Sequence, residues 1–128
     1  MNHRNITAKD VFNRMVELAE QDPDFCYKGQ YVIDEDGDEI KQTTCSYLGM
    51  DTENPHLGRP CIVGQALADL GFTREELAEV EDMFARHALA ALGIAQDGNY
   101  RKAIGLVQAA QDNGATWSGA IAHAAPVL

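Results

Sequence analysis

The segment from Pro60 to Gly71, PCIVGQALADLG, is apolar on nearly every side when it is placed on a helix. Its broad apolar face consists of Ile62, Val63, Ala66, Leu67 and Leu70. Gly64 and Ala68 keep the opposite side small. A helix with so little polar surface belongs in the middle of a fold, so we expect a central helix over about 60–71. Pro60 suits its first turn, and Gly71 suits the position just after its end.

Gly64 is the unusual residue of this segment. A glycine inside a helix costs about 1 kcal/mol relative to alanine. Its presence predicts that another part of the backbone packs closely against the helix at this point.

Two capping boxes mark the starts of further helices. Thr7 is followed three residues later by Asp10, and Thr73 is followed three residues later by Glu76. In each pair one side chain satisfies the backbone N–H of the other residue. With apolar residues at helical spacing, the pattern predicts helices over about 7–21, 73–93 and 99–112, and a short one after Thr116.

Residues from about 25 to 48 are rich in β-branched and aromatic residues, which is typical of strands. Asp36 and Gly37 lie between the two halves and form a strong hairpin signal. They predict one hairpin with Ile33 facing Ile40, and any loop of even length keeps the same faces. An isolated hairpin is marginally stable, so it has to pack on the helices or on a second subunit, which leaves a homodimer open.

The fold class predicted from these elements is α+β and mostly helical. About four to five helices surround the central helix over about 60–71, and the one hairpin covers about 25–48. A length of 128 residues fits a single domain over 1–128.

The formal net charge of −10 opposes direct binding to nucleic acid or to an anionic membrane. No apolar run is long enough to span a bilayer, and the N-terminus lacks the apolar stretch of a signal peptide. Three cysteines are too few for a secreted disulfide scaffold. We therefore expect reduced thiols and a cytoplasmic protein.

The acidic residues are clustered in two segments, around the expected hairpin tip and on the helix that follows Thr73. The favoured interpretation is a solvated surface. The functional interpretation is an interface for a protein partner with a basic surface, because concentrated charge steers association. The residues predicted to meet this partner are Asp34, Glu35, Asp36, Glu75, Glu76 and Glu79.

Cys61 follows Pro60 at the start of the central helix, where the helix dipole can stabilise a thiolate. A cysteine hydrolase would pair it with a histidine base, for which His56, His87 and His123 are candidates. The neighbouring residues match no peptidase signature. A buried core cysteine is therefore the favoured interpretation, and we predict no catalytic residue.

The sequence contains two candidate metal sites, one for zinc and one for calcium. The residues Cys26, Cys45, His56 and Cys61 could supply zinc ligands, but their spacing contains no Cys-x-x-Cys pair. The acidic run that begins at Asp34 lacks the glycine and glutamate that a calcium loop needs. The sequence predicts no metal and no cofactor.

A polar group near the C-terminus is formed by Gln108, Gln111, Asp112 and Trp117. It could line a polar cleft. The favoured interpretation is a helix C-terminal cap with one large apolar anchor.

Three motifs together resemble a group of small proteins from actinobacteria and their phages. They are Cys45-Ser-Tyr47, the run from Cys61 to Leu67, and Gln108-Ala-Ala-Gln-Asp112 with Trp117. The resemblance implies a bacterial or phage-infected cytoplasm and assigns no activity. The function predicted is a small, acidic, cytoplasmic protein-binding module without catalytic activity. A special case is a phage-encoded factor that acts on a host protein, and the alternative is a small hydrolase that uses Cys61.

Overall fold

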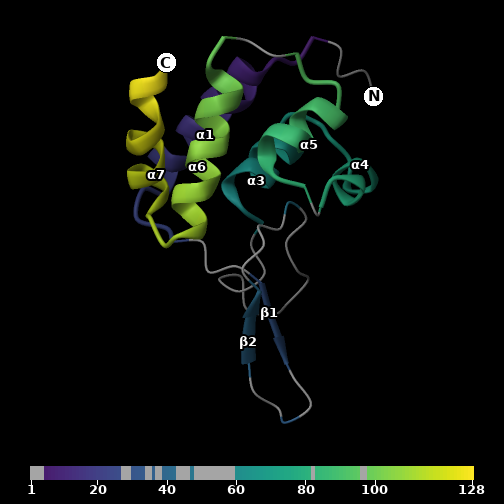
Figure 1. Ribbon diagram of the computed structural model, residues 1–128, viewed down its shortest axis with the longest axis vertical. Helices are drawn as coiled ribbons and strands as arrows, with labels where there is room; N and C mark the ends of the chain where they lie inside the picture. Colours follow the sequence, from purple (N-terminus) through teal and green to yellow (C-terminus); the bar gives the residue numbers. More distant parts are fainter. Residues whose placement is uncertain are drawn as a thin grey trace.

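The computed structural model describes residues 5–26, 30–33, 36, 39–42, 47, 60–81, 83–95 and 98–128. Its α-helices are α1 (Ala8–Gln21), α3 (Ile62–Asp69), α4 (Arg74–Glu79), α5 (Ala85–Ala91), α6 (Tyr100–Asp112) and α7 (Trp117–Ala124). A 3₁₀ turn, η1 (Ala125–Val127), follows α7, and two strands are present, β1 (Gln30–Ile33) and β2 (Glu39–Gln42). Figure 1 shows α1, α6 and α7 on one side of the helical body and α3, α4 and α5 on the other.

The capping box predicted at Thr7 is confirmed. The Thr7 hydroxyl accepts a hydrogen bond from the backbone N–H of Asp10 at 3.3 Å, and the Asp10 carboxylate accepts one from the backbone of Thr7 at 3.0 Å. The helix runs to Gln21, where the prediction ended it. Its buried face packs against α3, α6 and α7.

The apolar segment forms α3, although the helix is shorter than 60–71. Cys61 is its N-cap, so Pro60 precedes the helix rather than occupying its first turn. Gly71 follows it with a φ of 105°, which favours glycine and confirms the predicted end. The helix that packs against α1, α3, α5 and α7 is α6, so α3 shares the central position with it.

The predicted α+β class is wrong, because the packed body of the structure is built from helices. The buried apolar residues that the structure describes come from the helices, their flanking turns and Tyr47. The β1–β2 pairing comprises four residues on each side, far less than a hairpin over 25–48, and Figure 1 shows it extending away from the helices. It therefore adds no second layer to the core.

The predicted pairing register is also wrong. Val32 lies opposite Ile40, and Ile33 lies opposite Glu39. Five residues, 34–38, connect the strands, whereas the prediction required a connection of even length. Because neighbouring side chains on a strand point to opposite faces, this shift of one residue exchanges the two faces.

The helix predicted over 73–93 is two helices. The capping box between Thr73 and Glu76 is confirmed, with hydrogen bonds of 2.9 and 3.2 Å, but α4 ends at Glu79. Tyr47 occupies the break: its N–H donates to the Glu81 carboxylate at 2.6 Å, and its hydroxyl donates to the Met83 carbonyl. The Met83 carbonyl thus bonds to Tyr47 instead of to a helix N–H, and the Glu81 side chain is held by the same residue. The described part of the chain thus contains six α-helices, α3 and five others, which agrees with the four to five predicted around the central helix.

The last two helices follow the prediction closely. The Thr116 hydroxyl caps α7 by accepting from the Gly119 N–H at 3.0 Å. Trp117 is fully buried and contacts the ring of Phe25 edge-on, with 4.7 Å between ring centroids. The backbone N–H of Trp117 donates to the Phe25 carbonyl at 2.9 Å. This contact places the start of the predicted hairpin segment beside the α6–α7 turn.

None of the helices in the described ranges is long and apolar enough to cross a membrane.

Candidate functional site: a basic pocket between α5 and α6

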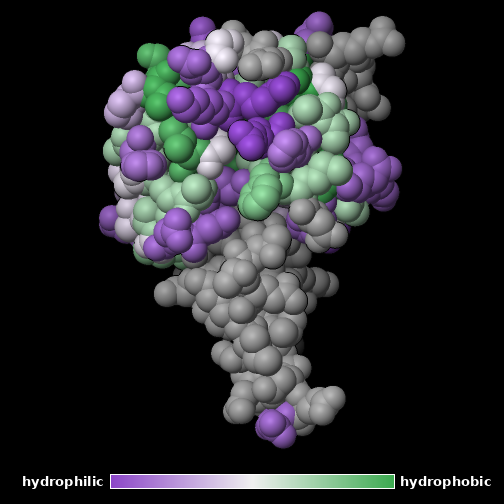
Figure 2. Space-filling model, viewed as in Figure 1, coloured by the Kyte–Doolittle hydropathy of each residue, from purple (hydrophilic) through white to green (hydrophobic). Residues whose placement is uncertain are grey.

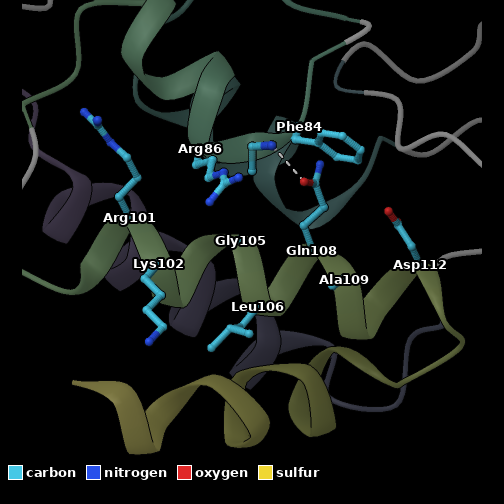
Figure 3. A pocket seen from close by; sticks show the side chains of 10 residues that line it. Phe84, Arg86, Arg101, Lys102, Gly105, Leu106, Gln108, Ala109 and Asp112 are labelled. Carbon is cyan, nitrogen blue, oxygen red and sulfur yellow. Dashed lines mark hydrogen bonds between the residues drawn. The ribbon is translucent and has the colours of Figure 1, made fainter.

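A pocket of about 590 Å³ lies between α5 and α6, a volume within the usual range for ligand sites, about 300–1,000 Å³. Residues of α6 at helical spacing form its floor, and the start of α5 forms its other wall (Figure 3). The lining residues are Phe84, Ala85, Arg86, Arg101, Lys102, Gly105, Leu106, Gln108, Ala109 and Asp112.

Gln108 holds the two walls of the pocket together. Its side-chain oxygen accepts a hydrogen bond from the backbone N–H of Ala85 at 2.8 Å, drawn as a dashed line in Figure 3. Its side-chain nitrogen donates to the Tyr47 hydroxyl at 3.1 Å. The first residue of α5 is therefore capped from α6, and the distance between the two helices is fixed at this end.

Three cations line the pocket. Figure 3 shows Arg86 reaching from α5 toward α6, whereas Arg101 and Lys102 leave the first turn of α6. The N-terminal end of a helix carries partial positive charge, so cations in a first turn are unfavourably placed. In the part of the chain that the structure describes, none of the three forms an ion pair. The pocket lining therefore carries an excess of positive charge.

The positive charge stands out because the chain as a whole has a net charge of −10. Residues 85–128 contain three basic and two acidic residues, so their formal charge is +1 and the remaining chain carries −11. Figure 2 shows strongly hydrophilic residues gathered between α5 and α6 on the face that is in view. The basic patch therefore lies on a molecule that is acidic elsewhere.

Arg101 has an unsatisfied donor. One of its terminal nitrogens donates to the Ile94 carbonyl at 2.9 Å, but its buried Nε has no hydrogen-bond partner among the residues that the structure describes. A buried donor without an acceptor costs free energy, and the cost is larger for a charged group. The side chain is therefore held at the pocket by one hydrogen bond while the guanidinium stays incompletely satisfied.

Gly105 lies in the middle of the pocket floor, in the interior of α6. A β-carbon added there would meet no heavy atom within 4 Å. Packing inside the chain thus gives no reason for a glycine at this helical position. The glycine leaves bare helix backbone open to the pocket.

Phe84 and Met83 form an apolar edge beside the pocket. The Phe84 side chain is 77% exposed, and that of Met83 is 39% exposed. In Figure 3, Phe84 and Asp112 lie at the opposite end of the pocket from Arg101 and Lys102. The pocket is therefore polarised: Arg101 and Lys102 form its cation end, an aromatic ring and a carboxylate lie at the other end, and Arg86 lies between the two.

Tyr47 is almost fully buried behind this edge. Its burial raises its pKa to about 12, against the opposing effect of the hydrogen bond from Gln108, and the negative charges of Asp112 and Glu81 add to the rise. The phenol is therefore neutral at physiological pH and acts as a donor to the Met83 carbonyl. Through this bond it supports the segment that carries Phe84.

Gln111 belongs to a second polar network, which is structural. Its side-chain oxygen accepts from the Ile62 N–H at 2.9 Å and from the indole N–H of Trp117 at 3.0 Å, and the residue is fully buried. The predicted C-terminal cap is thus wrong for both glutamines. Each of them caps the N-terminus of another helix, Gln108 that of α5 and Gln111 that of α3.

Cys61, the candidate nucleophile, is fully buried and disulfide-bonded. The expectation of reduced thiols is thus wrong for Cys61, and a disulfide sulfur offers no thiolate for catalysis. His87 and His123 are exposed on α5 and α7, and His56 lies outside the described residues.

The residues weighed as zinc ligands are not gathered into one site in the described part of the chain. Cys26 is a free cysteine whose thiol lies 3.8 Å from the Gly114 carbonyl, near the start of α7. Cys45 and His56 lie outside the described residues. Among the residues described, no cluster of three or more His, Cys, Asp or Glu could hold a metal ion.

The acidic residues divide into two kinds. Glu75, Glu79 and Asp36 are exposed, whereas Glu76 is engaged in its capping box. Asp34 and Glu35 lie outside the described residues. Some of the acidic side chains on and after α4 therefore stabilise the fold.

Sequence reasoning missed the cations and the glycine of the pocket. The signals were an Arg-Lys pair in the first turn of α6, where acidic residues are preferred, and Gly105 in a helix interior. Phe84 gave no such signal, because the sequence placed it inside one helix over 73–93 and only the structure shows it at the N-cap of α5.

Comparison with protein-family models, with curated proteins and with solved structures finds no match to this chain. The resemblance to proteins of actinobacteria and their phages therefore stays a prediction.

Proposed function

We propose that this protein is a non-enzymatic module that binds another protein, and that the pocket between α5 and α6, with the Phe84 edge, is its recognition surface. The observation that carries this proposal is the position of Phe84. A large apolar side chain held outward at the end of a helix is typical of an interface anchor.

An aromatic residue at this N-cap position lowers the stability of the helix. Helix N-caps favour Ser, Thr, Asp or Asn, whose side chains bond to the free N–H groups. Phe84 makes no such bond, and Gln108 supplies the missing acceptor from α6. The arrangement keeps α5 capped while Phe84 stays 77% exposed beside the pocket.

The acidic surface belongs to the same proposal in a different role. Glu75 and Glu79 are exposed on α4, the helix that precedes Phe84 in the chain. Charges of this kind steer a partner with a basic surface toward the molecule, and their effect falls with salt. The resemblance noted above makes a host protein of a phage-infected bacterium a candidate partner.

The cysteine hydrolase is not proposed, because Cys61 is buried in a disulfide. The cytoplasm stays a proposal for the compartment. A disulfide in that compartment is exposed to reducing thiols, which need access to a sulfur atom in order to attack it. The complete burial of Cys61 limits this access.

The proposal is tested by placing a photo-crosslinking amino acid at position 84 and irradiating the protein in a lysate of the source cells. The expected result is a discrete crosslinked species that mass spectrometry assigns to one protein. The matched control carries the same group at Ser118, which is exposed on α7 away from the pocket.

Equal crosslinking from positions 84 and 118, or none from position 84, would contradict the proposal. Charge removal provides a second comparison. Glu75→Gln with Glu79→Gln should reduce crosslinking from position 84 at low salt and leave it unchanged at high salt.

A further inference from the structure

We infer that the pocket receives an acidic peptide segment of the partner, with a carboxylate at the cation end and the peptide passing over Gly105. This inference rests on the proposed function and names the chemistry that the pocket recognises. It concerns Arg86, Arg101 and Lys102, none of which was assigned a role by the sequence.

The charge at the cation end selects a negative group. Three of the ten Lys and Arg residues line this pocket, and in the described ranges they have no carboxylate partner. Two of them add to the positive end of the α6 dipole. A carboxylate bound here is attracted by these charges and by the helix end, which a neutral ligand is not.

Arg101 points to the same ligand by separate evidence. Its Nε is buried and has no acceptor in the described part of the chain, although the residue is fixed to the Ile94 carbonyl. A negative charge beside the guanidinium offsets the cost of this unsatisfied donor. In the free protein the unsatisfied donor of Arg101 therefore costs free energy, and binding of an acidic ligand lowers this cost.

Gly105 indicates what lies beside the carboxylate. Among the described residues, no atom outside the surrounding helix backbone lies within 4 Å of a β-carbon built on Gly105, and bare helix backbone is where another main chain can approach closely. Ala109, one turn further along α6, lines the pocket with another small side chain. An extended or helical peptide fits this floor.

The far end of the pocket excludes a uniformly anionic polymer. Asp112 and the exposed ring of Phe84 lie there, so a second negative charge on the ligand would be repelled while an apolar side chain would be accepted. The net charge of −10 further disfavours nucleic acid. A peptide that combines acidic and apolar side chains meets both ends of the pocket.

The experiment uses the intact ¹⁵N-labelled protein and a short synthetic peptide that alternates glutamate and leucine. Binding is followed by NMR through the backbone amide of Gly105 and the Nε–Hε signal of Arg101. The expected result is a saturable shift of both signals. The matched peptide with glutamine in place of glutamate should bind at least about tenfold more weakly, because charge-assisted hydrogen bonds are lost.

Charge-reversed variants locate the site. Arg86→Glu with Lys102→Glu should weaken peptide binding at least about tenfold. Lys9→Glu with Arg74→Glu changes the net charge equally at exposed positions outside the pocket, and it should leave the affinity near that of the parent protein. Gly105→Leu, which fills open space in the free protein, should block the peptide without lowering the melting temperature.

Several outcomes overturn the inference: no shift at Gly105, equal binding of the glutamine peptide, equal loss in both double variants, or displacement of the peptide by inorganic phosphate alone. Self-association that Arg86→Glu with Lys102→Glu abolishes would assign the pocket to a second copy of this chain, and so would also overturn it. Crosslinking from position 84 that survives these two substitutions leaves the proposed function standing while the inference fails.

Discussion

Gly64 of α3 lies directly against the backbone of Tyr47. A β-carbon on Gly64 would stand 2.7 Å from the Tyr47 carbonyl carbon and closer still to its α-carbon and oxygen. The sequence-based prediction that another backbone packs at Gly64 is thus confirmed. The contact positions Tyr47 to bond with Glu81, Met83 and Gln108, and so connects α3 to the segment beside the pocket.

Gly64→Ala should lower the free energy of unfolding by at least about 2 kcal/mol, because backbone atoms rather than a flexible side chain have to move. Gly105→Ala is the matched control, since nothing lies near its added methyl group. It should raise the free energy by about 0.5–1 kcal/mol through helix propensity. Urea unfolding of both variants measures the contrast. Equal effects would show that Tyr47 does not lie on α3.

Gln111→Leu should be among the most destabilising changes in α6. It leaves the Ile62 N–H and the Trp117 indole N–H buried without an acceptor, at a cost of about 1–3 kcal/mol for each group. Gln108→Leu removes the acceptor of the Ala85 N–H and should cost less, because the Tyr47 hydroxyl keeps its bond to Met83. Unfolding free energies compare the two variants. A smaller loss for Gln111→Leu would contradict the network.

The sequence predicted the parts of the fold that depend on local chemistry. The capping boxes at Thr7 and Thr73 and the glycine end at Gly71 can be predicted because the residues involved are close in the sequence. The break between α4 and α5 could not be predicted from the sequence. It involves Tyr47, which comes from a distant segment and bonds to the Glu81 side chain and to the Met83 carbonyl.

The same distinction explains the candidate site. Arg101, Lys102 and Gly105 each violate a helix preference, and together these violations mark the pocket. The sequence shows each of them, but it does not show that Arg86 and Phe84 from α5 are brought to the same face by Gln108. The predicted hairpin register was wrong for a related reason. The pair Asp36-Gly37 indicates a turn but does not determine how many residues the turn contains.

Cysteine chemistry distinguishes the structure from the expectation of reduced thiols. Unfolding in guanidinium with iodoacetamide and without reductant should modify Cys26 and leave Cys61 unmodified, because Cys61 is disulfide-bonded and Cys26 is free. Addition of a reductant should then expose Cys61 to the reagent. Peptide mass spectrometry identifies the modified positions. Modification of Cys61 without reductant would mean that the disulfide is absent in solution.

The buried phenol of Tyr47 makes stability sensitive to high pH. Its pKa is raised from 10.0 to about 12, chiefly by burial, so the folded protein holds the phenolic proton more tightly than the unfolded chain does. The stabilisation from this group is fully present below pH 10 and is lost as the pH rises toward 12. Between about pH 9 and about pH 11 the loss amounts to about 1 kcal/mol.

Tyr47→Phe isolates this contribution, because other titrating groups remain in both proteins. At neutral pH the variant should be less stable by about 1–3 kcal/mol, since Gln108 and the Met83 carbonyl lose their partner. The gap between parent and variant should then narrow as the pH rises above 10. Urea unfolding along a pH series measures it. A gap that stays constant to pH 11 would show that the Tyr47 hydroxyl is solvated rather than held beneath the Phe84 edge.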